Sequence, residues 1–149
     1  MAGCAGCPMY QSGSQAFVPD EGVEGAEVFV LGQNPGADEA REGRPYVGQT
    51  GQSLTTRYFA EAGLERGVNV SLGNALRCRW RGGNDLPANP TLDKALAHCQ
   101  GAHFRLPSTT RLIVAQGGVA WKALGQTGTI GNWRGFLGRE YAQRLEDTC

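Results

Sequence analysis

The chain has 149 residues, 40% of them hydrophobic, and its 14 basic residues balance 14 acidic ones. This length suits a single domain with a real hydrophobic core. No run approaches the ~18 consecutive apolar residues of a membrane span, and the N-terminus has no apolar signal-peptide core, so we expect a soluble, cytoplasmic protein with no membrane partner. A neutral total charge argues against a general polyanion binder.

The charge is nevertheless unevenly distributed along the chain. Residues 1–65 carry three arginines against nine acidic residues, whereas residues 66–139 carry ten basic residues against two acidic ones. A basic second half suggests a surface that faces nucleic acid. Solvated charge scattered over several faces is the alternative.

The first half of the chain alternates strand and helix patterns. An apolar run at residues 27–31 is typical of a buried strand. Residues 50–62 have helical spacing and end at Gly63, a common helix stop. Residues 68–76 predict a second strand.

The second half continues the alternation. Residues 81–90 are rich in Gly, Asn and Pro and predict a loop. Thr91 is expected to cap a helix that runs to about residue 104, residues 111–115 predict a third strand, and residues 118–124 begin a third helix. Strands that alternate with helices in this way predict an α/β fold with a parallel sheet.

Glycine-rich loops that carry amide side chains follow the predicted strands. The first strand stops at the sequence GQNPG, residues 32–36, and a second loop, GRPYVG, follows at residues 43–48 after a short acidic segment. Ligands of parallel sheets bind at the carboxyl ends of the strands, so this region predicts a small-molecule or base pocket. An ordinary turn is the alternative for the first loop. The amide residues at or just past the predicted strand ends are Gln33, Asn34, Asn74 and Gln116.

Four of the five cysteines indicate a metal. Cys4 and Cys7 form a C-x2-C pair, whose thiolates converge on one metal or cluster across a tight turn. Cys78 follows the second predicted strand, and Cys99 lies late in the next helix. An odd cysteine count in an intracellular chain argues against disulfides. An iron–sulfur cluster, a zinc ion and unligated cysteines all remain open on spacing alone.

These segments, taken in order, resemble a known family. After the C-x2-C pair come GQNPGADEAREGRPYVGQTGQSL, then NALRCRW at the end of the second strand, and then a GGNDLPANP loop and a helix with a last cysteine. In this order they resemble the iron–sulfur uracil-DNA glycosylases, the family 4 and 5 type of the uracil-DNA glycosylase superfamily. RLIVAQGGVAWKALG resembles the next strand and helix of that family, and NWRG at residues 132–135 resembles its later arginine-glycine loop.

The resemblance implies a fold and an activity. The fold is a three-layer sandwich around a short parallel sheet, formed by residues 1–149 as one domain, with residues 1–25 as a cluster-ligating segment and linker. The activity is DNA repair, in which uracil is flipped out of DNA and its N-glycosidic bond is hydrolysed. The implied partner is DNA that contains uracil or a deaminated base, and the implied setting is a cytoplasm of prokaryotic or phage type.

Matching positions imply roles for individual residues. Asn34 is expected to hold the attacking water, beside Gln33, which stands where family 4 commonly has Glu. Tyr46 replaces a Phe that stacks on the base, and Asn74 matches the Asn that reads the uracil edge. The implied substrate-binding residues are Gly32, Gly36, Tyr46 and Asn74.

The resemblance also implies a cofactor and DNA contacts. The cofactor is a 4Fe–4S cluster, with zinc as the alternative, and its expected role is to brace a small domain rather than to carry electrons. Its implied ligands are Cys4, Cys7, Cys78 and Cys99. Phosphates are expected to meet arginines around Cys78 and in the later loop. The candidate DNA-binding residues are Arg77, Arg79, Arg81 and Arg134.

The chain departs from the family pattern at its end. In the family a fourth strand follows, and then a His-Pro loop whose His stabilises the leaving uracil. Here the sequence stops at Cys149, and its two histidines, His98 and His103, flank Cys99. We therefore expect the last strand to be missing, either because the chain is a piece of a longer protein or because the strand was lost. The alternative function is a non-catalytic DNA- or protein-binding module, attached to other domains of a longer polypeptide or to a replication protein.

Overall fold

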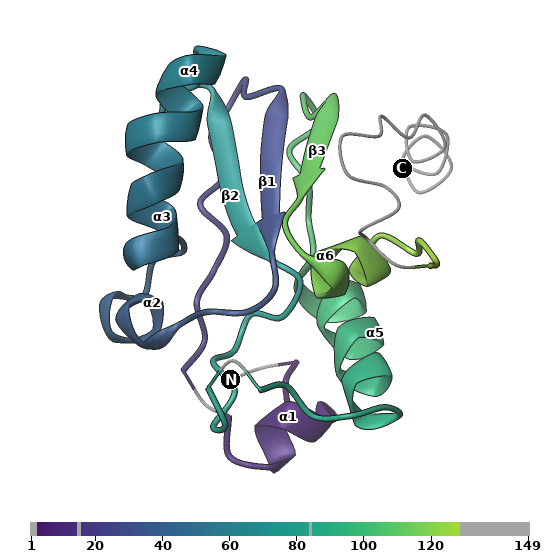
Figure 1. The fold of residues 1–149 in the computed structure, drawn as a ribbon. Helices are drawn as coiled ribbons and strands as arrows, with labels where there is room; N and C mark the ends of the chain where they lie inside the picture. Colours follow the sequence, from purple (N-terminus) through teal and green to yellow (C-terminus); the bar gives the residue numbers. More distant parts are fainter. Residues whose placement is uncertain (1–2, 15, 84, 129–149) are drawn as a thin grey trace.

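The core of the fold is a parallel sheet of three strands (Figure 1). The structure, a computed structural model, describes residues 3–14, 16–83 and 85–128. The strands are β1 (Val28–Gly32), β2 (Val70–Asn74) and β3 (Leu112–Ala115). They lie in the order β2-β1-β3, both pairs are parallel, and Val28 stands opposite Val70 and Leu112. The predicted α/β class with a parallel sheet is confirmed.

One face of the sheet is covered by a helical segment between β1 and β2, which stands beside β2 in Figure 1. Its parts are α3 (Gln49–Ser53), the π-helical η1 (Leu54–Phe59) and α4 (Ala60–Ala62). Val30 packs with Leu54 and Phe59 in one buried cluster. The helix predicted at residues 50–62 is confirmed in extent, and it ends at Gly63, which has a φ of 67°. Hydrophobic spacing does not reveal the π-helical turns, because they leave the apolar positions buried.

The opposite face is covered by the helix that follows β3. Phe29 and Leu31 pack with Ala120 of this helix, α6 (Gly118–Ala123). The longer helix α5 (Thr91–His103) precedes β3 and packs its buried Leu96 in a cluster with Met9. Helices on both faces of one sheet give the three layers that the sequence predicts.

The predicted start of α5 is wrong by one residue. Thr91 was expected to be the N-cap, but the N-cap is Pro90, whose carbonyl accepts a hydrogen bond from the Lys94 N–H at 3.1 Å. Thr91 is therefore the first residue of the helix. The N-cap residue makes no side-chain hydrogen bond to the start of the helix.

Three further segments complete the described structure. The acidic segment forms a short helix, α2 (Ala37–Glu42), and a single turn, α1 (Pro8–Gln11), follows the C-x2-C pair. Residues 16–23, expected to be part of a linker, instead run antiparallel to the β2 region. The backbones of Glu21 and Leu72 exchange two hydrogen bonds of 2.8 and 2.9 Å, and the Val18 N–H donates to the Arg77 carbonyl. The described helices are all too short or too polar to cross a membrane.

The topology creates one edge where a ligand can bind. The chain leaves the central strand β1 toward β2 over one face, and it reaches β3 over the other. The carboxyl end of β1 is thus a switch point, with a crevice between the two connections. The predicted absence of a fourth strand concerns the sequence after residue 128, outside the described residues.

Candidate active site

The site begins where the carboxyl ends of β1 and β2 pair, with Gly32 opposite Asn74. The Tyr46 hydroxyl and the Asn74 Oδ1 both crowd Gly32: a Cβ on this glycine would lie 2.5 Å from the hydroxyl and 2.6 Å from Oδ1. Any side chain at residue 32 would collide with both groups, so the close approach requires glycine. The fold thus brings together three of the predicted pocket residues, Gly32, Tyr46 and Asn74.

Tyr46 has an unusual environment. Its φ of 56° lies in the left-handed region, which costs a non-glycine residue about 1–3 kcal/mol. Its ring is packed in a buried cluster with Val30 and Leu54, and only 7% of the residue is exposed. Its hydroxyl is buried without a hydrogen-bond partner among the described residues. Burial, and secondarily the charge of Glu39, raise the pKa of this hydroxyl. An unpaired donor therefore lies beside the Asn74 amide.

Glu39 joins the two predicted pocket loops. Its Oε2 accepts a hydrogen bond from the Gly36 N–H at 3.0 Å, and its Oε1 accepts one from the Gly48 N–H at 2.7 Å. One carboxylate thus ties residues 32–36 to residues 43–48. Glu39 was not among the predicted site residues, although its place three residues after Gly36 is the spacing of a capping box.

The residues predicted to position water lie in the first loop. Asn34 is half-buried, and its Nδ2 donates to the Pro35 carbonyl at 3.2 Å. The Gln33 carbonyl accepts a hydrogen bond from the Leu76 N–H at 3.0 Å, which ties this loop to the chain that leaves β2. Asn34 therefore follows β1, and Asn74 is the last residue of the neighbouring β2, at the same edge of the sheet. Their predicted roles stay predictions.

An open hollow of about 300 Å³ lies at the same edge, next to the end of β3. Polar side chains from the start of α3 and from the segment after β3 meet apolar ones from η1. The lining residues are Gln49, Thr50, Ser53, Leu54, Tyr58 and Gln116. Gln116, noted from sequence for its place after a strand, thus borders a cavity.

The four predicted ligand cysteines are all buried, at 3–7% exposure, and none forms a disulfide. The Cys7 N–H bonds the Cys4 carbonyl at 2.9 Å in a tight turn. Burial first, and then the charges of the other three cysteines, raise the pKa of Cys78 to about 12. Burial also raises the pKa of Cys99, and the charges of Cys7 and Cys4 act in the same direction. The four thiols therefore lie near one another, although they come from the N-terminus, the segment after β2, and α5.

The described side chains do not form a ready-made site for a single metal ion. A tetrahedral zinc site needs sulfurs about 3.8 Å apart. Across residues 3–14, 16–83 and 85–128, no three His, Cys, Asp or Glu side chains converge closely enough to hold one metal ion. In a four-iron cluster each iron takes one thiolate, so the four buried thiols, called the cysteine cage below, equal in number the ligands of such a cluster.

Polar groups of the protein contact this cage. The His103 Nε2 lies 3.1 Å from the Cys4 Sγ, and the Arg77 N–H donates to the Cys99 Sγ at 3.3 Å. The His98 Nε2 lies 2.6 Å from the Gly3 carbonyl. Both histidines therefore contact the N-terminal segment that carries Cys4 and Cys7.

The arginines near Cys78 differ in position. Arg77 is 1% exposed, so the predicted phosphate contact is not available to it. Its guanidinium instead pairs with Asp20 and donates to the Asn74 carbonyl. Burial raises the pKa of Asp20 to about 6, although Arg77 opposes that rise. Arg79 is half-buried, Arg81 is exposed, and Arg134 lies outside the described residues.

The described residues form an α/β domain in which Gly32, Tyr46 and Asn74 meet at the switch point of a parallel sheet, and which also holds four buried thiols. Residues 19–145 match the model of the family described as "Uracil DNA glycosylase superfamily". The match covers most of the chain, and the protein belongs to this superfamily. The membership predicted from sequence is confirmed.

More particular relatives carry the name "Type-4 uracil-DNA glycosylase". The chain is 41% identical over 76 residues to the one from Sulfurisphaera tokodaii. This matched segment covers 51% of this chain and 34% of the relative. It is 31% identical over 117 residues to the one from Thermotoga maritima, covering 78% of this chain and 58% of the relative. The matches thus span between about a third and somewhat over half of the relatives' length.

Proposed function

We propose that this chain binds uracil in DNA and hydrolyses its N-glycosidic bond. The observation that carries the proposal is the convergence of the Tyr46 hydroxyl and the Asn74 amide on Gly32 at the switch point of the sheet. An Asn amide carries both a donor NH₂ group and an acceptor oxygen, which suits the edge of uracil. The names of the relatives support the same substrate.

The chemistry proposed for the site needs few groups. The bond between C1′ of the sugar and N1 of uracil breaks, and its electron pair leaves with the base. A water oxygen forms the new bond to C1′, and its proton passes to solvent. The Asn34 amide oxygen orients that water by accepting a hydrogen bond, but it is no effective base. Most of the rate must therefore come from stabilising the uracil anion, to which the Asn74 amide and the unpaired Tyr46 hydroxyl are suited donors.

We further propose that Cys4, Cys7, Cys78 and Cys99 hold a 4Fe–4S cluster. When bound, the cluster supplies metal–thiolate bonds that tie the N-terminus to β2 and α5. The protein contributes the buried cage and two polar contacts to sulfur, from Arg77 and His103. Arg79, Arg81 and Arg134 are proposed to meet the phosphates of the DNA strand.

A second candidate is a domain that binds the base without hydrolysing the bond. Its support is the place of the two histidines of the chain, both of which contact the N-terminal cysteine turn rather than the end of β1. In this reading the pocket captures a flipped base for a partner domain, as a single-domain module of a larger repair assembly.

The decisive experiment is a cleavage assay on a labelled single-stranded oligonucleotide with one deoxyuridine. Excision leaves an abasic site, which alkali converts to a strand break. We expect breaks with wild type, and losses on the order of a hundredfold with Asn34→Ala and Asn74→Ala. The same oligonucleotide with thymidine is the control. Binding without any break at stoichiometric protein would leave only the second candidate.

A further inference from the structure

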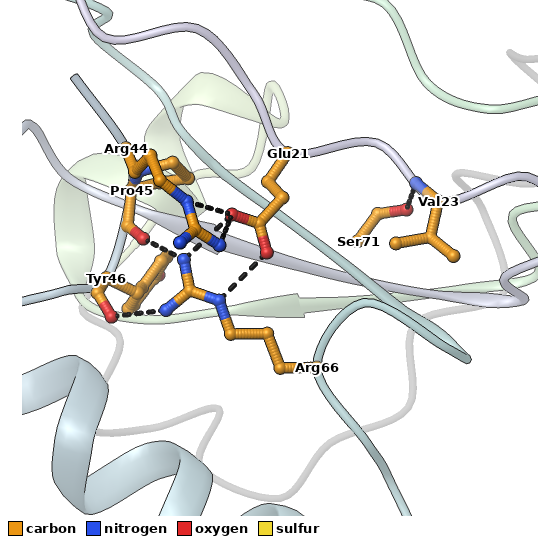
Figure 2. Close-up of polar contacts among 7 residues, drawn as sticks. All are labelled: Glu21, Val23, Arg44, Pro45, Tyr46, Arg66 and Ser71. Atoms are coloured by element: carbon orange, nitrogen blue, oxygen red, sulfur yellow. Dashed lines mark hydrogen bonds and ion pairs between the residues drawn. The ribbon is translucent and has the colours of Figure 1, made fainter.

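Three charged side chains form a connected group next to the backbone of Tyr46, namely those of Arg66, Glu21 and Arg44 (Figure 2). The Arg66 Nη1 donates to the Tyr46 carbonyl at 2.7 Å, and its Nη2 donates to the Pro45 carbonyl at 2.6 Å. The same guanidinium pairs with Glu21: Nε donates to Oε1 at 2.8 Å and Nη2 to Oε2 at 2.9 Å. Arg66 thus joins two successive carbonyls of the pocket loop to a carboxylate of the N-terminal segment.

The two inner members of this group are shielded from water. The side chains of Arg66 and Glu21 are 17% and 19% exposed, so their charge-assisted hydrogen bonds are only partly screened. Arg44, at 61% exposure, adds an outer contact to Glu21 at 2.9 Å. The hydrogen bond to Glu21, and after it the charges of Glu21 and Glu39, raise the pKa of Arg66 above its ordinary value.

The sheet holds the Glu21 side of the contact in place. The Glu21 backbone exchanges hydrogen bonds of 2.8 and 2.9 Å with Leu72 in the middle of β2. Two residues later the Val23 N–H donates to the fully buried Ser71 Oγ at 3.0 Å (Figure 2). The backbone of Glu21 is therefore fixed to the sheet. The hydrogen bonds of Arg66 connect the Glu21 carboxylate to the loop at residues 43–48.

We propose that Glu21 and Arg66 are positioning residues that hold Tyr46 in its left-handed conformation. They keep its ring and hydroxyl set against Gly32 and Asn74 before a base arrives. A non-glycine residue keeps a positive φ only where the surroundings over-determine it, and the paired donation to Pro45 and Tyr46 supplies that constraint. The inference rests on the proposed function and deepens it. Neither side chain touches the base, so both residues act through Tyr46.

The geometry makes lysine a poor substitute for Arg66. The fork of a guanidinium reaches a carboxylate and two carbonyls at once, whereas an ammonium is a single point of charge. Arg66→Lys keeps the charge and loses the fork. Arg57→Lys is the matched control, because Arg57 is 70% exposed and its ion pair to Glu61 is long, at 3.8 Å.

Two measurements test the proposal. In single-turnover cleavage of the uracil oligonucleotide, Arg66→Lys should slow excision on the order of tenfold to a hundredfold, because a small misplacement of a pocket group is costly. The Kd for the oligonucleotide should stay as in wild type. In amide hydrogen exchange, residues 43–48 should exchange at least about tenfold faster. Arg57→Lys should change neither quantity.

A double-mutant cycle separates positioning from general stability. In a Tyr46→Ala background, Arg66→Lys should slow excision no further, because the ring that Arg66 positions is absent. Additive losses in the double variant would overturn the proposal, as would wild-type exchange of residues 43–48 in Arg66→Lys. If wild type releases no uracil, the proposed function fails, and the exchange measurement alone decides whether the contact holds the loop.

Discussion

Tyr46 combines a positive φ with a buried hydroxyl that has no partner in the described part of the chain. A buried polar group left unpaired costs about 1–3 kcal/mol. We therefore predict that Tyr46→Phe raises the free energy of unfolding in urea by about 1 kcal/mol. Tyr58→Phe, at a residue 53% exposed, should change it by less than about 0.5 kcal/mol. A stability loss in Tyr46→Phe would show that the hydroxyl is already satisfied.

Glu21 gives the fold a dependence on acidity. The hydrogen bond from Arg66, followed by that from Arg44, lowers the pKa of Glu21 below its ordinary value of 4.5. A carboxylate whose pKa is depressed on folding adds stability above its unfolded pKa and loses it as the pH falls through the folded value.

Urea unfolding of wild type and Glu21→Gln, followed from pH 7 down to about pH 3, should therefore diverge. Wild type should be the more stable at pH 7, and the difference should shrink as the pH falls below 4.5. If the difference in unfolding free energy between the two proteins stays constant over this pH range, folding does not lower the pKa of Glu21.

At the scale of elements, Glu39 determines how α2 and α3 begin. Its two carboxylate oxygens accept hydrogen bonds from the N–H groups of Gly36 and Gly48, the residues that precede these helices. Glu39→Gln leaves one acceptor and turns an amide NH₂ toward the other donor. We predict a loss of about 2 kcal/mol in the free energy of unfolding. Glu42→Gln, an exposed change in the same helix, is the control, and equal effects of the two would refute the bridging role.

The elements show what sequence patterns capture. Strand positions follow from short apolar runs, and the end of α4 follows from Gly63, because burial and backbone freedom act locally. The acidic segment that forms α2 has no apolar stripe, and only a contact with the second loop reveals why Glu39 is there. Similarly, the wide turns of η1 leave no trace in spacing.

At the scale of the whole molecule, the cysteine site joins segments that are far apart in sequence. Cys4 and Cys7 come from the N-terminal turn, Cys78 follows β2, and Cys99 belongs to α5. We predict that purified protein contains roughly four iron and four sulfide per chain, because one thiolate serves each iron of a cubane cluster.

Substitution of a ligand tests that prediction. Cys78→Ser should lose most of the iron and lower the thermal midpoint by several degrees. Cys149→Ser, at the cysteine left out of the ligand set, should keep wild-type iron. Zinc in place of iron and sulfide would contradict the cluster.

The site itself was only partly visible in the sequence. Resemblance pointed to Gly32, Tyr46 and Asn74. The paired strand ends bring Gly32 and Asn74 together, and the loop at residues 43–48 adds Tyr46. Arg77 was misread, because a run of alternating arginines looks solvated, while its burial depends on a contact with Asp20, which lies 57 residues away. Glu21 and Arg66 were missed for the same reason: their partnership spans 45 residues and has no local signal.

The most direct test of the pocket is uracil release by wild type, Gly32→Ala and Gly22→Ala. A Cβ at Gly32 would crowd the Tyr46 hydroxyl and the Asn74 Oδ1, whereas one at Gly22 meets nothing within 4 Å. We predict that wild type and Gly22→Ala release uracil from the single-stranded oligonucleotide at equal rates. Gly32→Ala, still folded, should be slower by on the order of a hundredfold. Wild-type release by Gly32→Ala would contradict a base pocket at the end of β1.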